Sequence, residues 1–251
     1  MTQRAAAVPT RPAISGMAAR QMPTGAALSA ALMLALAIPA FWPDYLAKLR
    51  AVDPYTHAHA LLGLLWLLAL IVQPLHIRAR KVPLHRLVGR VAGIIGVGFV
   101  VSSVLLTHHR ASRMDAATFE RDGFGFYLPL SMAAFFCAAL VMGLIWRRVT
   151  PMHARFMVCT SLSLVDPLLA RLLYFYGPPL PAPLLYQVPA FTVITAVLVV
   201  LLRTLPPSSP GRGSFRVFSL AVIGVLLLYF ATPYSGTWLR FLQWFRALPL
   251  T

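Results

Sequence analysis

Long apolar runs separated by short polar segments recur along the whole sequence. A helix needs about 20 apolar residues to cross the ~30 Å hydrocarbon layer of a membrane, and most of the runs approach that length. The pattern therefore predicts an all-α fold, a polytopic transmembrane helix bundle of about seven helices. The last run is long enough only if its ends are counted generously. The predicted spans are 25–41, 55–77, 87–107, 124–146, 156–176, 184–202 and 217–232.

The segments that flank the spans are short. Residues 1–24 are rich in Ala, Arg, Pro, Thr and Met and contain no acid, which predicts a disordered cytoplasmic lead-in. Residues 25–232 form the predicted transmembrane domain, and residues 233–251 form a short C-terminal tail on the outer side. The first run also resembles a signal-peptide core, with a weak cleavage pattern at Ala35-Leu36-Ala37. Its length favours an uncleaved helix, because such cores typically span ~7–15 residues.

Composition supports a membrane protein over a basic soluble one. The net charge is +16, and the isoelectric point near 11.3 would indicate nucleic-acid binding in a soluble protein. However, 59% of the residues are hydrophobic and only 11% are charged, whereas a soluble domain carries about 25% charged residues. The basic residues also lie in short clusters between the apolar runs, as in membrane loops. We therefore expect the lipid bilayer as partner and no nucleic acid.

The distribution of Lys and Arg predicts the orientation, because cytoplasmic loops carry an excess of both. With seven spans and a cytoplasmic N-terminus, most of the 22 basic residues fall on the cytoplasmic side. All acids except Asp166 fall in the predicted outer loops. The sequence thus predicts a multi-pass protein of the bacterial inner (cytoplasmic) membrane. The predicted cytoplasmic basic residues are Arg4, Arg11, Arg20, Arg78, Arg80, Lys81, Arg86, Arg90, Arg147, Arg148, Arg155, Arg203, Arg212 and Arg216.

Small residues are expected to mediate helix packing, since every predicted helix is hydrophobic nearly all round. Gly89, Gly93 and Gly96 form such a face on the third span. Cys137 and Cys159 both lie inside apolar runs and do not have the spacing of a metal site, so we expect them to be packing residues.

Polar and small residues form one stripe along the second span. His59, Gly63, Trp66 and Gln73 are spaced i, i+4, i+7 and i+14, so they share one narrow face at ~3.6 residues per turn. Such a stripe on an apolar helix points into the bundle rather than toward lipid. Either Trp66 and Gln73 bond to neighbouring helices, or the stripe faces a ligand or cofactor.

All seven histidines lie near span ends, where water or headgroups can solvate them. Membrane cytochromes of the b type place axial histidines on facing helices near each leaflet, because neutral imidazole ligates iron well. Haem b is therefore the leading cofactor hypothesis, with His59 and His108 as the first iron ligands considered. The outer pair would be His59 with His108 or His109, and the inner pair His76 or His85 with His153.

Asp166 is the only acid inside a predicted span. A charged side chain there costs ~2.5–3.5 kcal/mol on insertion scales, so a partner or a proton is expected. Arg171 is the nearest candidate partner in sequence, and Pro167 would loosen the helix between them. A structural ion pair is one interpretation. The others are a proton relay, a substrate contact, or a propionate-binding role for Arg171.

Several sequence blocks carry a family resemblance. The runs 57–66 (HAHALLGLLW), 73–75 (QPL) and 85–89 (HRLVG) form the first group, and 153–157 (HARFM) with Asp166-Pro167 and Arg171 forms the second. Across about residues 53–175 the chain resembles bacterial multi-pass inner-membrane proteins that contain domains of unknown function. The resemblance implies the fold class and no defined activity. Ala154 departs from the basic residue expected at that position.

Three functional hypotheses follow. The first is a haem b protein for membrane electron transfer. The second is a small-molecule or proton-coupled carrier that uses Trp66, Gln73, Asp166 and Arg171. The third is a non-catalytic membrane subunit or assembly factor, whose partner would be another membrane subunit. A retinal protein is disfavoured, because Lys48 and Lys81 are the only lysines and neither lies in the seventh span. The sequence contains no nucleophile elbow, phosphate loop or zinc-protease motif and does not decide whether the protein is an enzyme.

Overall fold

The structure is a computed structural model that describes residues 16–209, 212–232 and 235–251, with the backbone alone for residues 16–24, 183 and 184. These residues form helices joined by short connections, and no strand occurs among them. The longer helices are α1 (Gly16–Phe41), α2 (Pro54–Arg78), α3 (Val82–Ser112), α5 (Tyr127–Ile145), α6 (Thr150–Leu162), α7 (Val165–Tyr176), α8 (Gln187–Thr204), α9 (Arg212–Ala231) and α10 (Gly236–Arg246). The short ones are η1 (Leu46–Ala51), α4 (Ala116–Asp122), η2 (Gly123–Phe126) and η3 (Pro183–Tyr186).

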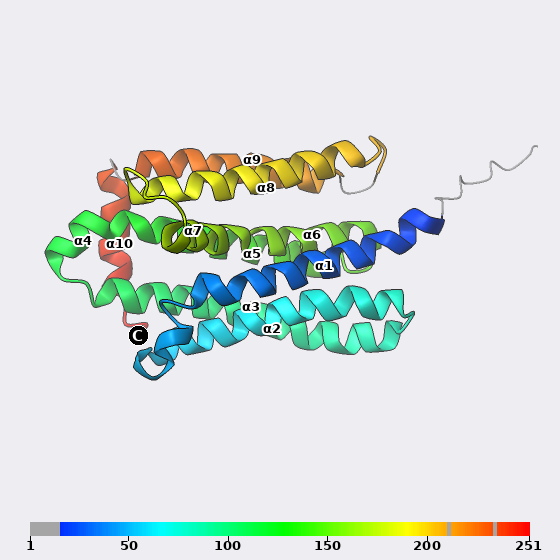
Figure 1. Cartoon of the computed structure of the whole chain (residues 1–251), viewed down its shortest axis with the longest axis horizontal. Coiled ribbons are helices and arrows are strands. Elements are labelled where there is room, and N and C mark those ends of the chain that lie inside the picture. The colour runs from blue at the N-terminus through cyan, green and yellow to red at the C-terminus, as the bar shows by residue number, and fades with distance from the viewer. Residues whose placement is uncertain (1–15, 210–211, 233–234) are drawn as a thin grey trace, which may run out of the picture.

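The predicted all-α polytopic bundle is confirmed. Six helical segments of the described chain are long and apolar enough to cross a membrane, and α1 adds a shorter apolar helix over Gly25–Phe41. The long helices lie side by side in layers, with α8 and α9 in one, α5 and α6 in the next, and α2 and α3 in the third (Figure 1). Large apolar side chains such as Ile94 and Leu220 are exposed, as expected for surfaces that face lipid rather than water.

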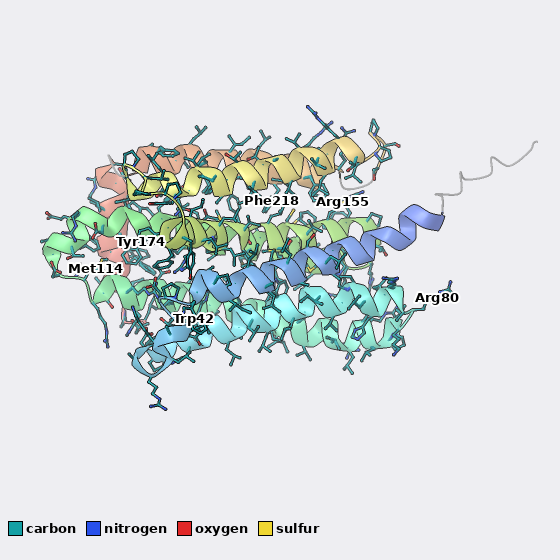
Figure 2. All side chains as sticks on the ribbon, in the orientation of Figure 1. Trp42, Arg80, Met114, Arg155, Tyr174 and Phe218 are labelled. Carbon is teal, nitrogen blue, oxygen red and sulfur yellow. The ribbon has the colours of Figure 1, made fainter. Side chains whose placement is uncertain are left out.

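The two ends of the bundle are distinct. We call the end crossed by α10 the α10 end, and the opposite end, where residues 79–81 connect α2 to α3, the α2–α3 loop end (Figure 1). The chain enters α1 near the loop end and finishes at the α10 end. Figure 2 shows Arg80 at the loop end and Met114 at the α10 end.

Three segments differ from the sequence expectations. Helix α1 begins at Gly16, so residues 16–24 of the expected lead-in are helical, while residues 1–15 lie outside the described part. The fifth predicted span consists of two helices, α6 and α7, that meet at Ser163 and Leu164. The expected C-terminal tail contains α10, which runs across the end of the bundle (Figure 1).

Helix α2 packs on α3 in one antiparallel register. Gly63 lies opposite Phe99, and Trp66 lies opposite Gly96, where a Cβ atom would come within 2.8 Å of the indole. Farther along, Gln73 lies opposite Gly89. As the residue number rises along α2, the number of the facing residue falls along α3, as in an antiparallel pair of helices. Gly96 also lies against Leu140 of α5, so this glycine allows three helices to approach closely.

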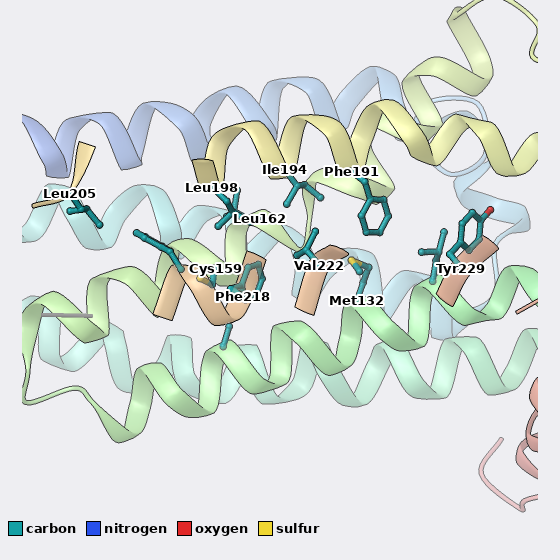
Figure 3. Packing of buried hydrophobic residues seen from close by; sticks show 13 residues of the cluster. Met132, Cys159, Leu162, Phe191, Ile194, Leu198, Leu205, Phe218, Val222 and Tyr229 are labelled. Carbon is teal, nitrogen blue, oxygen red and sulfur yellow. The ribbon is translucent and has the colours of Figure 1, made fainter. Parts of the chain in front are cut away.

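A second apolar cluster joins the remaining layers. Phe191, Ile194 and Leu198 of α8 are almost fully buried and point toward α6 and α9 (Figure 3). Cys159 of α6 lies fully buried in this cluster, which confirms its expected role as a packing residue. Phe218, Val222 and Tyr229 of α9 complete it with Met132 of α5.

The break between α6 and α7 follows from local chemistry. Pro167 lacks the N–H group that would bond to the carbonyl of Ser163, and its ring clashes with a helical carbonyl at that position. Hydroxyl groups also bond back to the α6 backbone, which bends helices. The Thr160 hydroxyl donates to Met157 O at 2.6 Å, and the Ser163 hydroxyl donates to Thr160 O at 2.8 Å. Helix α7 then turns away from the line of α6 to pack against α1 and α8 (Figure 1).

Substitution of Gly96 should destabilise the bundle. An alanine Cβ at this position would lie 2.8 Å from both Leu140 and Trp66, and overpacking of this kind typically costs about 1–3 kcal/mol. Gly93→Ala is the matched control, because its Cβ would meet only Leu144 at 3.9 Å. Thermal unfolding in detergent should show a lower midpoint for Gly96→Ala and an unchanged or higher one for Gly93→Ala. Equal midpoints for the two variants would contradict the proposed register.

Candidate functional site

The α2–α3 loop end brings two of the predicted histidines together. His85 lies in the first turn of α3 and His153 in the first turn of α6, each two residues after a proline suited to a helix start. Their ring centroids are 6.4 Å apart, and the ring planes are nearly perpendicular, at 80°. The structure therefore pairs His85, rather than His76, with His153.

Each ring is held through its Nδ1 atom. His153 Nδ1 lies 2.8 Å from the carbonyl oxygen of Gly143. Because a carbonyl can only accept, this bond places the proton of a neutral His153 on Nδ1 and leaves a lone pair on Nε2. Gly143 makes the approach of α5 and α6 possible, since a Cβ at this position would overlap Met157.

His85 is held by the side chain of Gln73. In the amide orientation that satisfies both of its ends, Gln73 donates to Nδ1 and to the carbonyl oxygen of His85 and accepts from Gly89 N at 2.7 Å. The opposite orientation offers an oxygen to Nδ1 instead. That orientation would set the oxygen against the His85 carbonyl and the nitrogen against Gly89 N–H, so Nδ1 of His85 accepts and the proton of its neutral ring lies on Nε2. Within the described residues, no hydrogen bond reaches Nε2 of His153.

The surroundings of this pair are basic. His76 is close enough to His85 to interact electrostatically, and its Nδ1 atom is buried without a hydrogen-bond partner. Every acid of the described chain lies at the α10 end or in α7. The basic residues of the loop end are Arg78, Arg80, Lys81, Arg86, Arg90, Arg147, Arg148, Arg155, Arg203, Arg212 and Arg216.

At the α10 end, His59 contacts α3. Its ring stacks on Phe99 with centroids 4.6 Å apart, and its Nδ1 atom lies 3.1 Å from Ser102 Oγ. Since the Ser102 hydroxyl donates to the carbonyl of Phe99 at 2.9 Å, its oxygen accepts from His59. This helix-to-helix bond extends the α2–α3 register to the α10 end.

The structure does not bring His59 and His108 together. His108 is buried against Phe245 of α10, and its Nδ1 atom lies 2.7 Å from the hydroxyl of Thr251. His109 instead faces Tyr55, with ring centroids 4.4 Å apart. Its Nε2 atom lies 3.9 Å from Asp53. The three imidazoles thus contact different neighbours, in contrast to the pair at the loop end.

The stripe on α2 makes helix contacts. Gln73 bonds to α3, as the first interpretation of the stripe expects, whereas Gly63 and Trp66 pack against α3 without a hydrogen bond from their side chains. Trp66 is 2% exposed and lies edge-on to Phe136 at 5.0 Å, which adds α5 to the contact. Its indole Nε1 is nevertheless buried without a hydrogen-bond partner.

Asp166 and Arg171 are not a direct ion pair in the described structure. Asp166 is 4% exposed and its Oδ1 atom is without a hydrogen-bond partner. The Arg171 guanidinium lies over the Phe41 ring, 4.9 Å from its centroid, and its buried Nε is also unpartnered. Arg171 is close enough to Asp166, Asp44 and Arg110 to interact with each electrostatically.

No family model, curated protein or solved structure matches the chain. The resemblance to bacterial membrane proteins of unknown function therefore stays a prediction.

Sequence reasoning missed two contributors to these sites. The contact of the Gly143 carbonyl could not be predicted, because it involves the backbone and no side chain. Helix α10 could have been predicted, because the apolar residues Trp238, Leu242 and Phe245 recur at helical spacing.

Asp53 should make the α10 end sensitive to acid. Burial acts to raise the pKa of Asp53, but hydrogen bonds from the N–H and hydroxyl of Thr56 and the nearby His109 ring outweigh it, so the pKa lies below 3.8. Ionised Asp53 therefore contributes its full stabilisation of the fold above about pH 4. This contribution is lost as the pH falls through the lowered pKa of Asp53. Asp53 also caps α2, so Asp53→Ala should cost about 1 kcal/mol near neutral pH.

Thermal midpoints of the wild type, Asp53→Ala and Asp53→Asn at neutral and acidic pH test this expectation. Asn keeps the cap but cannot ionise, so Asp53→Asn should stay close to the wild type at neutral pH and lose less stability in acid. An Asp53→Ala midpoint equal to that of the wild type at neutral pH would show that the cap contributes nothing.

Proposed function

We propose that the protein binds haem b between His85 and His153 and transfers electrons within a membrane. The observation that carries the proposal is the paired arrangement of the two imidazoles, whose ring centroids lie 6.4 Å apart. Two imidazoles on one metal ion, each with an iron–nitrogen distance near 2 Å, have centroids about 6 Å apart. The observed spacing is close to this value.

The donor set fits a haem better than a bare metal ion. A haem would supply four nitrogen ligands of its own, so His85 and His153 would hold its iron without a further protein ligand. A bare transition metal ion usually takes three or four protein ligands. Among the described residues, no group of three or more His, Cys, Asp or Glu side chains could hold one.

The anchoring of His153 supports the same interpretation. Histidines that bind a metal through Nε2 typically donate Nδ1–H to a carbonyl or a similar acceptor, which fixes the tautomer and the ring orientation. Gly143 O fills this role for His153. The Gln73 amide donates to Nδ1 of His85, so this amide would have to turn for Nε2 of His85 to bind iron. When bound, a haem with two histidine ligands changes oxidation state without an open site for a substrate, which favours electron transfer over catalysis.

The absorption spectrum of protein purified from haem-replete cells tests this proposal. The wild type should show a haem band that shifts on reduction. His85→Ala and His153→Ala should each lower the haem content per protein about tenfold or more, since each removes an axial ligand. His57→Ala is the control with full haem content, because His57 contacts Tyr45 and Leu49 near η1, at the other end of the bundle. A colourless wild-type preparation would refute the proposal.

The orientation belongs to the same proposal. The loop end carries basic residues and no acid, so the positive-inside rule favours this end in the cytoplasm. The N-terminus would then lie in the cytoplasm and the C-terminus on the outer face of a bacterial inner membrane. The haem would lie near the cytoplasmic leaflet.

Reporter fusions test the orientation. Alkaline phosphatase is active only outside the cytoplasm, whereas green fluorescent protein exported in unfolded form is dark there. A fusion in the connection between α2 and α3 should therefore be fluorescent and lack phosphatase activity, and a fusion after Thr251 should behave oppositely. If both fusions give the reverse result, the orientation is opposite to the one proposed. If both give the same result, the chain does not cross the membrane an odd number of times between the two positions.

A further inference from the structure

The break between α6 and α7 places an acid inside the bundle. Asp166 is the second residue of α7, immediately after the interruption at Ser163 and Leu164. The backbone of both residues keeps αR torsion angles, so the interruption is a change of direction between two helices rather than an unwound segment. The break alone does not make a site, so the surroundings of the carboxyl group decide what it can do.

The N–H groups of the two residues at the break already have hydrogen-bond partners. Ser163 N donates to Cys159 O at 3.4 Å, and Leu164 N donates to Ser161 O at 3.0 Å. The hydroxyls of Thr160 and Ser163 also bond to α6 carbonyls. The Asp166 carboxylate is therefore not needed as a hydrogen-bond acceptor for these N–H groups.

The carboxyl group itself has no compensating partner. Asp166 is 4% exposed, and its Oδ1 atom is buried without a hydrogen bond. Arg171 interacts with it electrostatically but lies over the Phe41 ring. Tyr229 of α9 is the titratable group on a neighbouring helix that interacts with it. The first turn of a helix favours an anion, but this effect offsets only part of the cost of burying a charge.

A bound proton removes this cost directly. The neutral acid has no charge to desolvate, and its hydroxyl becomes a hydrogen-bond donor. A proton also needs no cavity, unlike a solute or a hydrated cation. The removal of the proton would leave a buried anion near Arg171. The protonation state of Asp166 is therefore coupled to the charges of the α10 end.

We propose that Asp166 is a proton-binding site inside the membrane, formed by the α6–α7 break. Its carboxylate takes a proton from water and becomes a neutral carboxylic acid. This assignment is independent of the haem proposal, because α7 lies apart from His85 and His153. It gives the protein a group that can take up or release a proton within the bilayer.

Infrared spectroscopy of the full-length protein in lipid nanodiscs tests the assignment. At neutral pH the wild type should show the carbonyl stretching band of a protonated carboxylic acid, with a shift in D₂O. Asp166→Asn should lose the whole band. Asp115→Asn should retain it, because Asp115 is exposed and accepts hydrogen bonds from Thr118. Hydrogen bonds from Thr118 lower the pKa of Asp115 below 3.8, so Asp115 is ionised at neutral pH. Absence of the band in the wild type would overturn the assignment whether or not the variant folds.

Thermal stability gives a second, independent outcome. If Asp166 carries a proton, the isosteric Asp166→Asn variant should unfold at neutral pH at the wild-type temperature or above it. If Asp166 is instead ionised to compensate Arg171, the variant should unfold several degrees lower, because it would leave a buried cation unpaired. That lower midpoint would contradict the proposal.

Discussion

The close approach of α2 to the glycine face of α3 is the contact on which the rest of the structure depends. Lipid tails are as apolar as leucine, so helices in a bilayer gain little from the hydrophobic effect and associate through close packing. Gly96 lets Trp66 and Leu140 meet over α3, which joins three helices at one level. The same register sets Gln73 beside His85 at one end and His59 beside Ser102 at the other.

This arrangement separates two kinds of chemistry along the bundle. The loop end is basic and pairs two imidazoles, and the bond from His153 Nδ1 to Gly143 O leaves a lone pair on the Nε2 atom of His153. The acids other than Asp166 lie at the α10 end, and Asp166 is buried without a direct partner at the start of α7. The N–H groups of Ser163 and Leu164 at the break are bonded to α6 carbonyls. The side chains that are left unsatisfied therefore stand out as candidates for function.

The sequence predicted the spans well, because long apolar runs are a strong and local signal. The stripe on α2 and the glycines of α3 were also visible, since helical spacing alone places them on shared faces. The choice of His85 over His76 as the partner of His153 was not visible, because it depends on where α3 and α6 meet in space. Pro167 indicated a weakened helix, but the complete break also needed hydroxyl bonds from Thr160 and Ser163.

Electron paramagnetic resonance of the oxidised, purified protein tests the central claim most directly. Two histidines on one ferric haem give a low-spin signal, and nearly perpendicular ligand planes make that signal strongly anisotropic. The 80° angle between the rings of His85 and His153 therefore predicts a highly anisotropic low-spin signal. A high-spin ferric signal, or no ferric haem signal in protein from haem-replete cells, would contradict the pairing of these histidines on one iron.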